Sequence, residues 1–183
     1  FDRANMHKRF ISLNLKSEKG LEVMHKLLAE ADVFITNMRA KSLAKMGLDW
    51  ESLHARYPRL VMGHGLGYGK KGPEKDNAGF DVTCYMGRGG VFGTTVNKGD
   101  APMIPTNGYG DFQASMFLAS GILAALIGRE KTGAGDYVTC ALEHAAIYAL
   151  STGMVSAQYG NQYPKSRREV NNPLNNVFHS KDD

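Results

Sequence analysis

Residues 10–37 read FISLNLKSEKGLEVMHKLLAEADVFITN and set the pattern for the first half of the chain. Apolar and polar residues alternate over 10–15, which predicts a short β-strand. Ser17 follows as a candidate N-cap residue of a helix. The run VFITN over 33–37 is β-branched and aromatic and predicts a second strand. The helix between these strands has one apolar face, formed by Leu21, Met24, Leu27, Leu28 and Ala31.

The same alternation of strands and helices continues downstream. A short helix is predicted over Lys41–Met46, and Gly47 ends it as a typical helix C-terminal residue. Asp49 is placed to cap a further helix, WESLHARY, before Pro58. The segment LVMGHGLGYG, residues 60–69, then predicts a strand that ends in glycines. Strands and helices that alternate with short connections indicate an α/β fold with a parallel sheet.

The second half of the chain is less regular. Residues 63–110 are rich in glycine and predict loops, with one helix through DVTCYMG. The apolar segment after Asp111 predicts a buried core helix that ends near Gly128, shorter than the ~18 residues that a membrane span needs. Three segments follow: a strand around Tyr137–Cys140, a second apolar helix over Glu143–Ala157, and a polar, extended tail from Gln158.

The composition indicates which class of ligand and which cell compartment to expect. Of the 183 residues 43% are hydrophobic and 22% are charged, as in ordinary globular proteins. The net charge of +4 suits a phosphate-bearing ligand, whereas short basic clusters without zinc-finger spacing argue against nucleic acid. The six histidines show no metal-ligand spacing, so no metal site is expected. Cys84 and Cys140 are predicted to be buried free thiols, which indicates a reducing cytoplasm.

Asp111 is the most conspicuous candidate for chemistry. It lies in NGYGDFQAS, residues 107–115, between glycines and the apolar segment. An aspartate at this place is most often an N-cap residue. The same position, at the positive end of a helix, also keeps a carboxylate ionised and ready to act as a nucleophile toward an activated acyl group. The position alone leaves both interpretations open.

Alternating glycines at 63, 65, 67 and 69 do not form a dinucleotide-binding motif. Such a motif must open directly into a helix, and here the glycines run into Lys70-Lys71-Gly72-Pro73. Glycines of this kind let a backbone approach a ligand closely.

Four segments, in this order, resemble the class III CoA-transferases of the formyl-CoA and carnitine CoA-transferase type. They read HKRFISLNLKSEKG, ADVFITNMR, MGLDWESLHARYPRLVMGHGLGYGKKGP and GDFQASMFLASGILAALIGREKTGAGDYV. The resemblance implies a Rossmann-like parallel sheet with helices, within an interlocked homodimer. It divides the chain into residues 1–157, the large α/β domain without its N-terminal strand, and residues 158–183, a linker toward a smaller domain outside this sequence.

The resemblance also implies the site residues. Asp111 stands at the position of the family's catalytic nucleophile. The CoA-binding positions carry over to Leu13, Asn14, Leu15, Lys16, Asn37, Met38, Arg39, Lys45, Met46, Ala78, Gly79, Phe80 and Asp81. Lys16, Arg39 and Lys45 are sensible partners for the phosphates of CoA. The chain departs from the family at Met38, where an aromatic residue is usual, and at Ala40-Lys41, which replace Pro-Gly.

The activity implied is transfer of CoA from an acyl-CoA to a free carboxylic acid through an aspartyl intermediate, with CoA as substrate and neither metal nor membrane involved. One alternative is an α-methylacyl-CoA racemase, but Phe80 stands where such racemases carry a proton-transferring histidine. A non-catalytic CoA-binding protein is the other. The acid stays open among a 2-hydroxy acid, a dicarboxylate, carnitine and a bile acid. The acyl pocket is assigned to Tyr85, Met86, Tyr109 and Phe112, although core packing would account for these side chains equally well.

Overall fold

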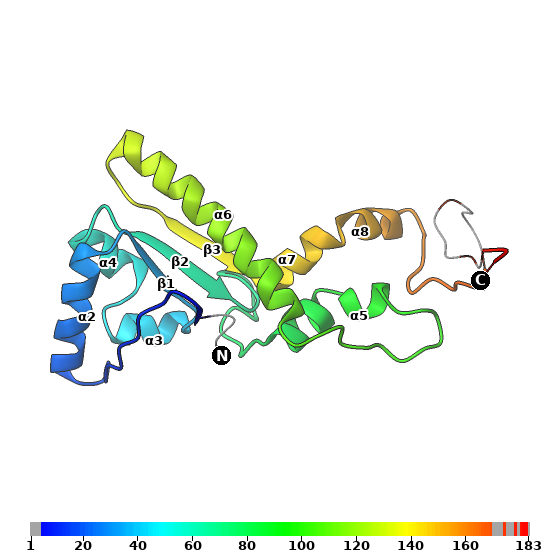
Figure 1. The fold of residues 1–183 in the computed structure, drawn as a ribbon, viewed down its shortest axis with the longest axis horizontal. Helices are drawn as coiled ribbons and strands as arrows, with labels where there is room; N and C mark the ends of the chain where they lie inside the picture. Colours follow the sequence, from blue (N-terminus) through cyan, green and yellow to red (C-terminus); the bar gives the residue numbers. More distant parts are fainter. Residues whose placement is uncertain (1–4, 170–173, 175–177, 179, 183) are drawn as a thin grey trace.

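The computed structural model describes residues 5–169, 174, 178 and 180–182 (Figure 1). The elements of its first half are α2 (Glu18–Glu30), β1 (Val33–Thr36), α3 (Ala40–Lys45), α4 (Trp50–Arg56) and β2 (Val61–Leu66). The elements of its second half are the π-helix η1 (Asp81–Arg88), α5 (Val91–Thr94), α6 (Tyr109–Thr132), β3 (Tyr137–Ala141), α7 (Leu142–Ala149) and α8 (Ser151–Gln158).

The three strands form one parallel sheet in the order β1-β2-β3, which confirms the predicted α/β class. Val33 is paired with Val61, and Met62 with Tyr137. Side chains of successive strand residues point to opposite faces. Met62 therefore packs into the core formed with α2, α3 and α4, whereas Gly63 faces Ile122 of α6. The sheet thus lies between these short helices and α6 (Figure 1).

The helix caps predicted for the first half of the chain are confirmed. Ser17 Oγ accepts a hydrogen bond from the Gly20 amide at 3.1 Å at the start of α2. Asp49 Oδ1 accepts one from the Ser52 amide at 3.1 Å at the start of α4. Gly47 follows α3 with a φ of +65°, a conformation that glycine adopts without a steric penalty. These local signals fix where the first helices begin and end.

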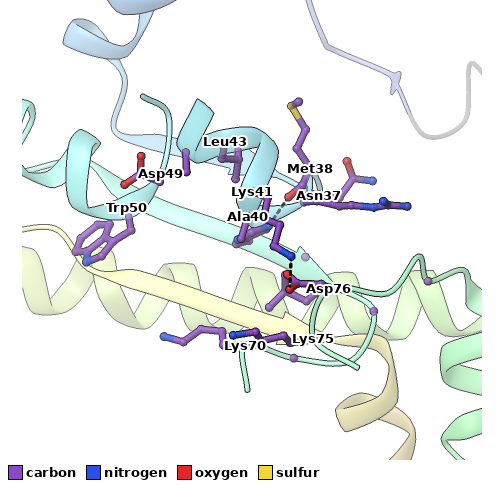
Figure 2. Close-up of a pocket in the computed structure, with 18 of the residues that line it drawn as sticks. Asn37, Met38, Ala40, Lys41, Leu43, Asp49, Trp50, Lys70, Lys75 and Asp76 are labelled. Carbon is purple, nitrogen blue, oxygen red and sulfur yellow. Dashed lines mark hydrogen bonds and ion pairs between the residues drawn. The ribbon is translucent and has the colours of Figure 1, made fainter. Parts of the chain in front are cut away.

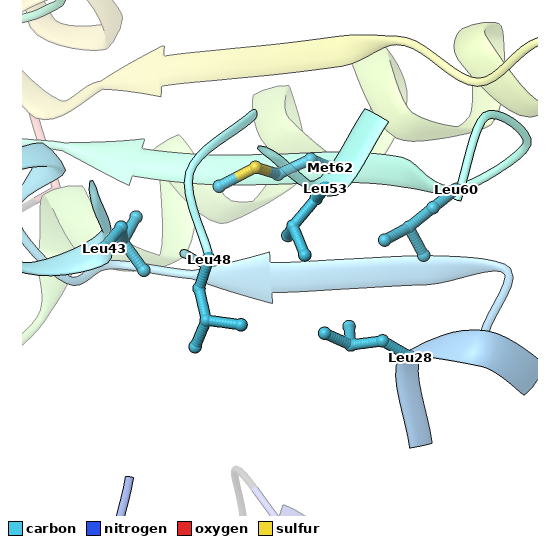
Figure 3. Packing of buried hydrophobic residues seen from close by; sticks show 6 residues of the cluster. All are labelled: Leu28, Leu43, Leu48, Leu53, Leu60 and Met62. Carbon is cyan, nitrogen blue, oxygen red and sulfur yellow. The ribbon is translucent and has the colours of Figure 1, made fainter. Parts of the chain in front are cut away.

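One hydrophobic core holds α2, α3 and α4 against the sheet. Figure 3 shows its buried members, which are Leu28, Leu43, Leu48, Leu53, Leu60 and Met62. Leu48 and Leu53 are 0% and 1% exposed. Full burial of a leucine side chain contributes about 1.5–3 kcal/mol, so this cluster is a main source of stability for the half of the sheet around β1 and β2.

Arg129 fastens the C-terminal end of α6 to the sheet. Its Nη2 donates to Asp32 Oδ1 at 2.8 Å, directly before β1. Its Nη1 donates to the Arg59 carbonyl at 3.1 Å, two residues before β2. A single guanidinium therefore links α6 to the starts of two strands.

Two sequence predictions about exposure and pairing were wrong. Residues 10–15 form no strand, and Phe10 and Ile11 are 66% and 65% exposed, because a strand needs a hydrogen-bonded neighbour as well as an alternating sequence. Leu27, assigned to the apolar face of α2, is 47% exposed.

Helix α6 is longer and more exposed than predicted. It runs to Thr132 over 24 residues, and Met116, Leu123 and Ile127 are 68%, 61% and 67% exposed. Among the described residues it is the one helix that is long and apolar enough to cross a membrane, judged by length and composition. Within the described part of the chain, the covered side of α6 is the one that packs against β2, β3, η1 and α7. Because α6 is apolar all round, its sequence does not tell which side that is.

The remaining elements agree with the sequence in outline. The helix predicted through DVTCYMG is present as η1, and the second apolar helix is divided at Leu150 into α7 and α8. Both cysteines are free; Cys84 is buried and Cys140 is half-buried. Residues 159–169 contain turns and bends, and most of the predicted linker beyond them lies outside the described residues. The boundary at residue 157 stays a prediction.

Candidate functional site

Asp111 is the third residue of α6 rather than its N-cap residue. The N-cap position is taken by Gly108, whose φ is +73°. A carboxylate in the first turn still interacts favourably with the positive end of the helix. The Asp111 side chain turns back toward this end, since a Cβ built on Gly108 would lie 3.6 Å from Asp111 Oδ2. The N-cap interpretation of Asp111 is therefore wrong.

The cap of α6 comes from Asp81, thirty residues earlier in the chain. Asp81 Oδ1 accepts a hydrogen bond from the Gly110 amide at 2.8 Å, and Asp81 is 8% exposed. Its second oxygen, Oδ2, is buried without a hydrogen-bond partner among the described residues. Gly110 lies so close to Tyr85 and Asp81 that a side chain there would displace them. Asp81 thus joins η1 to the turn that presents Asp111.

This environment raises the pKa of the Asp111 carboxyl. Partial burial is the larger cause, because it disfavours the charged form, and the nearby charge of Asp81 is the smaller one. The direction is opposite to the expectation that the helix terminus keeps Asp111 more readily ionised. A carboxylate with a raised pKa is more basic, and more nucleophilic when ionised, than an ordinary aspartate.

The four aromatic and methionine residues assigned to the acyl pocket fall into two pairs. Tyr85 and Met86 are core residues, 2% and 0% exposed, and the Tyr85 hydroxyl donates to Gln113 Oε1 at 2.7 Å. Tyr109 and Phe112 are 40% and 48% exposed and flank Asp111 on the first turn of α6. Only the second pair is open to a ligand beside Asp111.

A cavity of about 870 Å³ lies at the carboxyl ends of β1 and β2 (Figure 2). Ligands in α/β sheets bind outside this end of the strands. Six of the predicted CoA-binding residues line the cavity, namely Asn37, Met38, Arg39, Ala78, Gly79 and Phe80. The structure therefore brings together two segments, 37–39 and 78–80, that are forty residues apart in the sequence.

The other predicted CoA-binding residues lie outside this cavity. Leu13, Asn14, Leu15 and Lys16 precede α2, where Asn14 Oδ1 accepts from the Lys16 amide at 3.1 Å and Leu15 packs against the core. Lys45 is exposed at the end of α3, and Met46 also packs against the core. Asp81 and Asp111 meet at the start of α6 instead. The roles of these residues toward CoA stay predictions.

The cavity also contains functional candidates that were not predicted from the sequence. Three lysines, Lys41, Lys70 and Lys75, line it together with the predicted Arg39. Lys41 is paired with Asp76 at 2.8 Å (Figure 2). Three further lining residues are Trp50, His64 and Tyr137. Their convergence depends on how β2 and β3 pair, a feature that no local motif signals.

No group of three His, Cys, Asp or Glu side chains within the described part of the chain is arranged to hold a metal ion.

The whole chain, residues 1–183, matches the sequence family described as CoA-transferase family III. The protein belongs to this family. It is 46% identical over 182 residues to (R)-2-hydroxy-4-methylpentanoate CoA-transferase from Clostridioides difficile, covering 100% of this chain and 46% of that protein. It is 49% identical over 186 residues to cinnamoyl-CoA:phenyllactate CoA-transferase from Clostridium sporogenes, covering 100% of this chain and 45% of that protein.

Solved structures agree with this family and with the fold. A CAIB/BAIF family protein from Brucella suis superimposes with a TM-score of 0.80 at 32% identity, over 87% of this chain and 42% of that one. The protein Rv3272 from Mycobacterium tuberculosis gives a TM-score of 0.77 at 27% identity, over 84% of this chain and 43% of that one. The chain thus spans less than half the length of these relatives. The family and the fold that the sequence motifs implied are confirmed.

Proposed function

We propose that the full-length protein is a CoA-transferase in which Asp111 is the nucleophile. The observation that carries this proposal is the setting of Asp111. Its side chain is partly exposed on the first turn of α6, between Tyr109 and Phe112. Its pKa is raised by partial burial and by the charge of Asp81. A basic carboxylate at the positive end of a helix suits attack on a thioester carbonyl.

The reaction proceeds by alternating acyl and thiolate transfers. The Asp111 carboxylate attacks the donor thioester carbonyl, the C–S bond breaks, and a mixed anhydride and CoA thiolate result. The thiolate attacks the Asp111 carbonyl, the donor acid leaves as its carboxylate, and an aspartyl-CoA thioester remains. The acceptor carboxylate attacks the carbonyl of this thioester, the C–S bond breaks, and a second mixed anhydride and CoA thiolate result. The returning thiolate then attacks the acceptor carbonyl and restores the Asp111 carboxylate.

No net proton transfer is required in this sequence, so the site needs no general acid. It needs stabilisation of negative charge on the attacked carbonyl oxygen and exclusion of water from the anhydride. The positive end of α6 supplies the first. The apolar side chains beside Asp111 contribute to the second.

The cavity at the ends of β1 and β2 is the proposed CoA site. Segments 37–39 and 78–80 line it. Segment 78–80 leads directly into η1, which begins with the Asp81 that caps α6. CoA bound along this segment would extend toward Asp111.

The proposed acids are 2-hydroxy acids with a branched or aromatic side chain. The relatives at 46% and 49% identity are named for (R)-2-hydroxy-4-methylpentanoate and for phenyllactate, both of this class. The exposed rings of Tyr109 and Phe112 beside Asp111 suit such side chains.

We further propose that the full-length protein is a cytoplasmic homodimer. The exposed side chains of Met116, Leu123 and Ile127 on α6 form an apolar surface of the kind that an interface covers. The free thiols of Cys84 and Cys140 suit a reducing compartment. Light scattering at several concentrations tests the assembly, and a monomer at all of them contradicts it.

The activity is tested by incubating the full-length protein with an acyl-CoA and a free 2-hydroxy acid, and by detecting the new CoA ester chromatographically. The Asp111→Asn variant, which keeps size and removes the nucleophile, is expected to lose at least about a thousandfold in kcat. Asp100→Asn, a change at an exposed aspartate, is the matched control. Transfer that continues at a normal rate in Asp111→Asn contradicts the proposal.

A further inference from the structure

Tyr137 is the last ring of an aromatic stack on the wall of the cavity. Its ring lies on Trp50 with 5.6 Å between centroids and an interplanar angle of 10°. The ring of His54 stacks in turn on Trp50 at 4.4 Å and 22°. Lys70 Nζ lies 4.7 Å from the centroid of the Tyr137 ring, within the range of a cation–π interaction. The stack therefore ends in a cation.

His64 holds the Tyr137 ring in position through a hydrogen bond to the Tyr137 hydroxyl. His64 is 1% exposed, with Nε2 2.7 Å from the Met38 carbonyl oxygen and Nδ1 2.7 Å from the Tyr137 hydroxyl. A carbonyl accepts only, so Nε2 carries the hydrogen. Burial lowers the pKa of His64 and favours the neutral ring. Nδ1 of that ring is then an acceptor, and the Tyr137 hydroxyl donates to it.

Lys70 differs from the neighbouring Lys41 in its partners. Lys41 is neutralised by Asp76 at 2.8 Å. No carboxylate of the described residues lies within ion-pair distance of Lys70. Arg39 and Lys75 line the same cavity and add positive charge to it. A cation that is held over a fixed ring, at a cavity, and without an acidic partner calls for an anionic ligand.

We propose that Lys70 binds a phosphate group of acyl-CoA, and that Tyr137, fixed by His64 and Trp50, is the positioning residue that holds Lys70 over the cavity. This inference rests on the proposed function. It adds a ligand-binding residue to which the family resemblance assigned no role. It also explains why a buried histidine and a tyrosine lie on the wall of a nucleotide-sized cavity: together they tie Lys70 to the backbone of Met38.

The first test compares Lys70→Gln with Lys71→Gln in the full-length protein. Lys71 is exposed and is not among the residues that line the cavity, so it serves as a matched loss of charge. Calorimetry gives the Kd for CoA, for 3′-dephospho-CoA and for pantetheine, which has no phosphate. Lys70→Gln is expected to raise the Kd for CoA about tenfold, as for the loss of one charge-assisted contact. The Kd for pantetheine is expected to stay unchanged. Lys71→Gln is expected to change the Kd for CoA less than about twofold.

The ligand series also distinguishes the phosphates. If Lys70 binds the 3′-phosphate, Lys70→Gln has no effect on 3′-dephospho-CoA; if it binds the diphosphate, the tenfold effect persists. Both results support the proposal. The proposal is overturned if the Lys70→Gln variant binds CoA as tightly as the wild type does. It is also overturned if the substitution weakens the binding of pantetheine as much as the binding of CoA. A wild-type protein that binds no CoA contradicts the proposed function itself.

The second test concerns the positioning role of Tyr137. Tyr137→Phe keeps the ring under Lys70 and is expected to change the Kd for CoA less than about threefold. Tyr137→Leu removes the ring and is expected to raise the Kd for CoA as much as Lys70→Gln does. The double variant Tyr137→Leu/Lys70→Gln is expected to bind no more weakly than Lys70→Gln alone. Additive losses in the double variant overturn the positioning role, and pantetheine binding reports whether each variant keeps its folded site.

Discussion

Asp81 is predicted to act on both the stability of α6 and the reactivity of Asp111. In the structure its Oδ1 caps α6 through the Gly110 amide at 2.8 Å, and its Oδ2 is buried without a described partner. Loss of an N-cap side chain costs about 0.5–2 kcal/mol. The unpartnered Oδ2 offsets part of this, because its removal relieves an unfavourable burial. We therefore expect Asp81→Ala to lower the free energy of unfolding by about 1 kcal/mol, and Asp81→Asn, which keeps the acceptor, by less.

The reactivity of Asp111 provides the second measurement on the same variants. The charge of Asp81 is the smaller of the two causes that raise the Asp111 pKa. Asp81→Asn removes this charge, so the pKa of Asp111 falls but stays above its ordinary value, because partial burial remains. Reaction requires the ionised carboxylate. The acid limb of the kcat/KM profile should therefore move to lower pH in Asp81→Asn.

Urea denaturation and the pH profile of transfer check the two parts, with Asp100→Ala as the control. Asp100 is exposed and accepts from the Asn97 side chain at 3.1 Å, so its loss should change stability by less than about 0.5 kcal/mol. The reasoning is refuted if Asp81→Ala leaves the urea midpoint unchanged, or if the acid limb of Asp81→Asn moves to higher pH.

Two further predictions concern packing and are measured by urea denaturation. Leu53→Ala empties a site that is 1% exposed and should cost about 2–5 kcal/mol, whereas Leu27→Ala, at a residue 47% exposed, should cost less than about 1 kcal/mol; equal losses would contradict the core described above. Gly63→Ala places a methyl group against Ile122 of α6 and should cost about 1–3 kcal/mol, whereas Gly93→Ala meets nothing within 4 Å and should be near neutral. A tolerated Gly63→Ala would argue against close packing of α6 on β2.

Local signals in the sequence predicted the elements of the first half well. The caps at Ser17 and Asp49 and the stop at Gly47 depend on residues within one helical turn. The strands β1 and β2 follow from short apolar runs between turn residues. Such features are decided by neighbours in the chain and are visible without the fold.

Non-local contacts account for the failures. The segment 10–15 alternates as a strand does, but no described strand pairs with it. The apolar composition of α6 predicted a buried helix, whereas in the described structure only the side packed on β2, β3, η1 and α7 is covered. Asp111 looked like a cap because the true acceptor, Asp81, lies thirty residues away. Tertiary structure brings these groups together, and no spacing in the sequence encodes it.

The residues of the candidate site also fall into two groups, those that could be predicted from the sequence and those that only the fold brings together. Asn37 and Arg39 could be placed with Phe80 because family motifs mark both segments, and the structure puts them around one cavity. No binding role was predicted for Lys70 or Tyr137. They meet because β3 pairs with β2 in a register that sets Tyr137 beside Met62.

The central claim is that Asp111 carries the acyl group and then CoA. It is tested most directly by incubating the full-length protein with an acyl-CoA, quenching with hydroxylamine, and mapping the product by peptide mass spectrometry. The account predicts a hydroxamate on the peptide that contains Asp111, absent when acyl-CoA is omitted and absent in Asp111→Asn. A protein that transfers CoA while this peptide stays unmodified, or with the adduct on another residue, would contradict it.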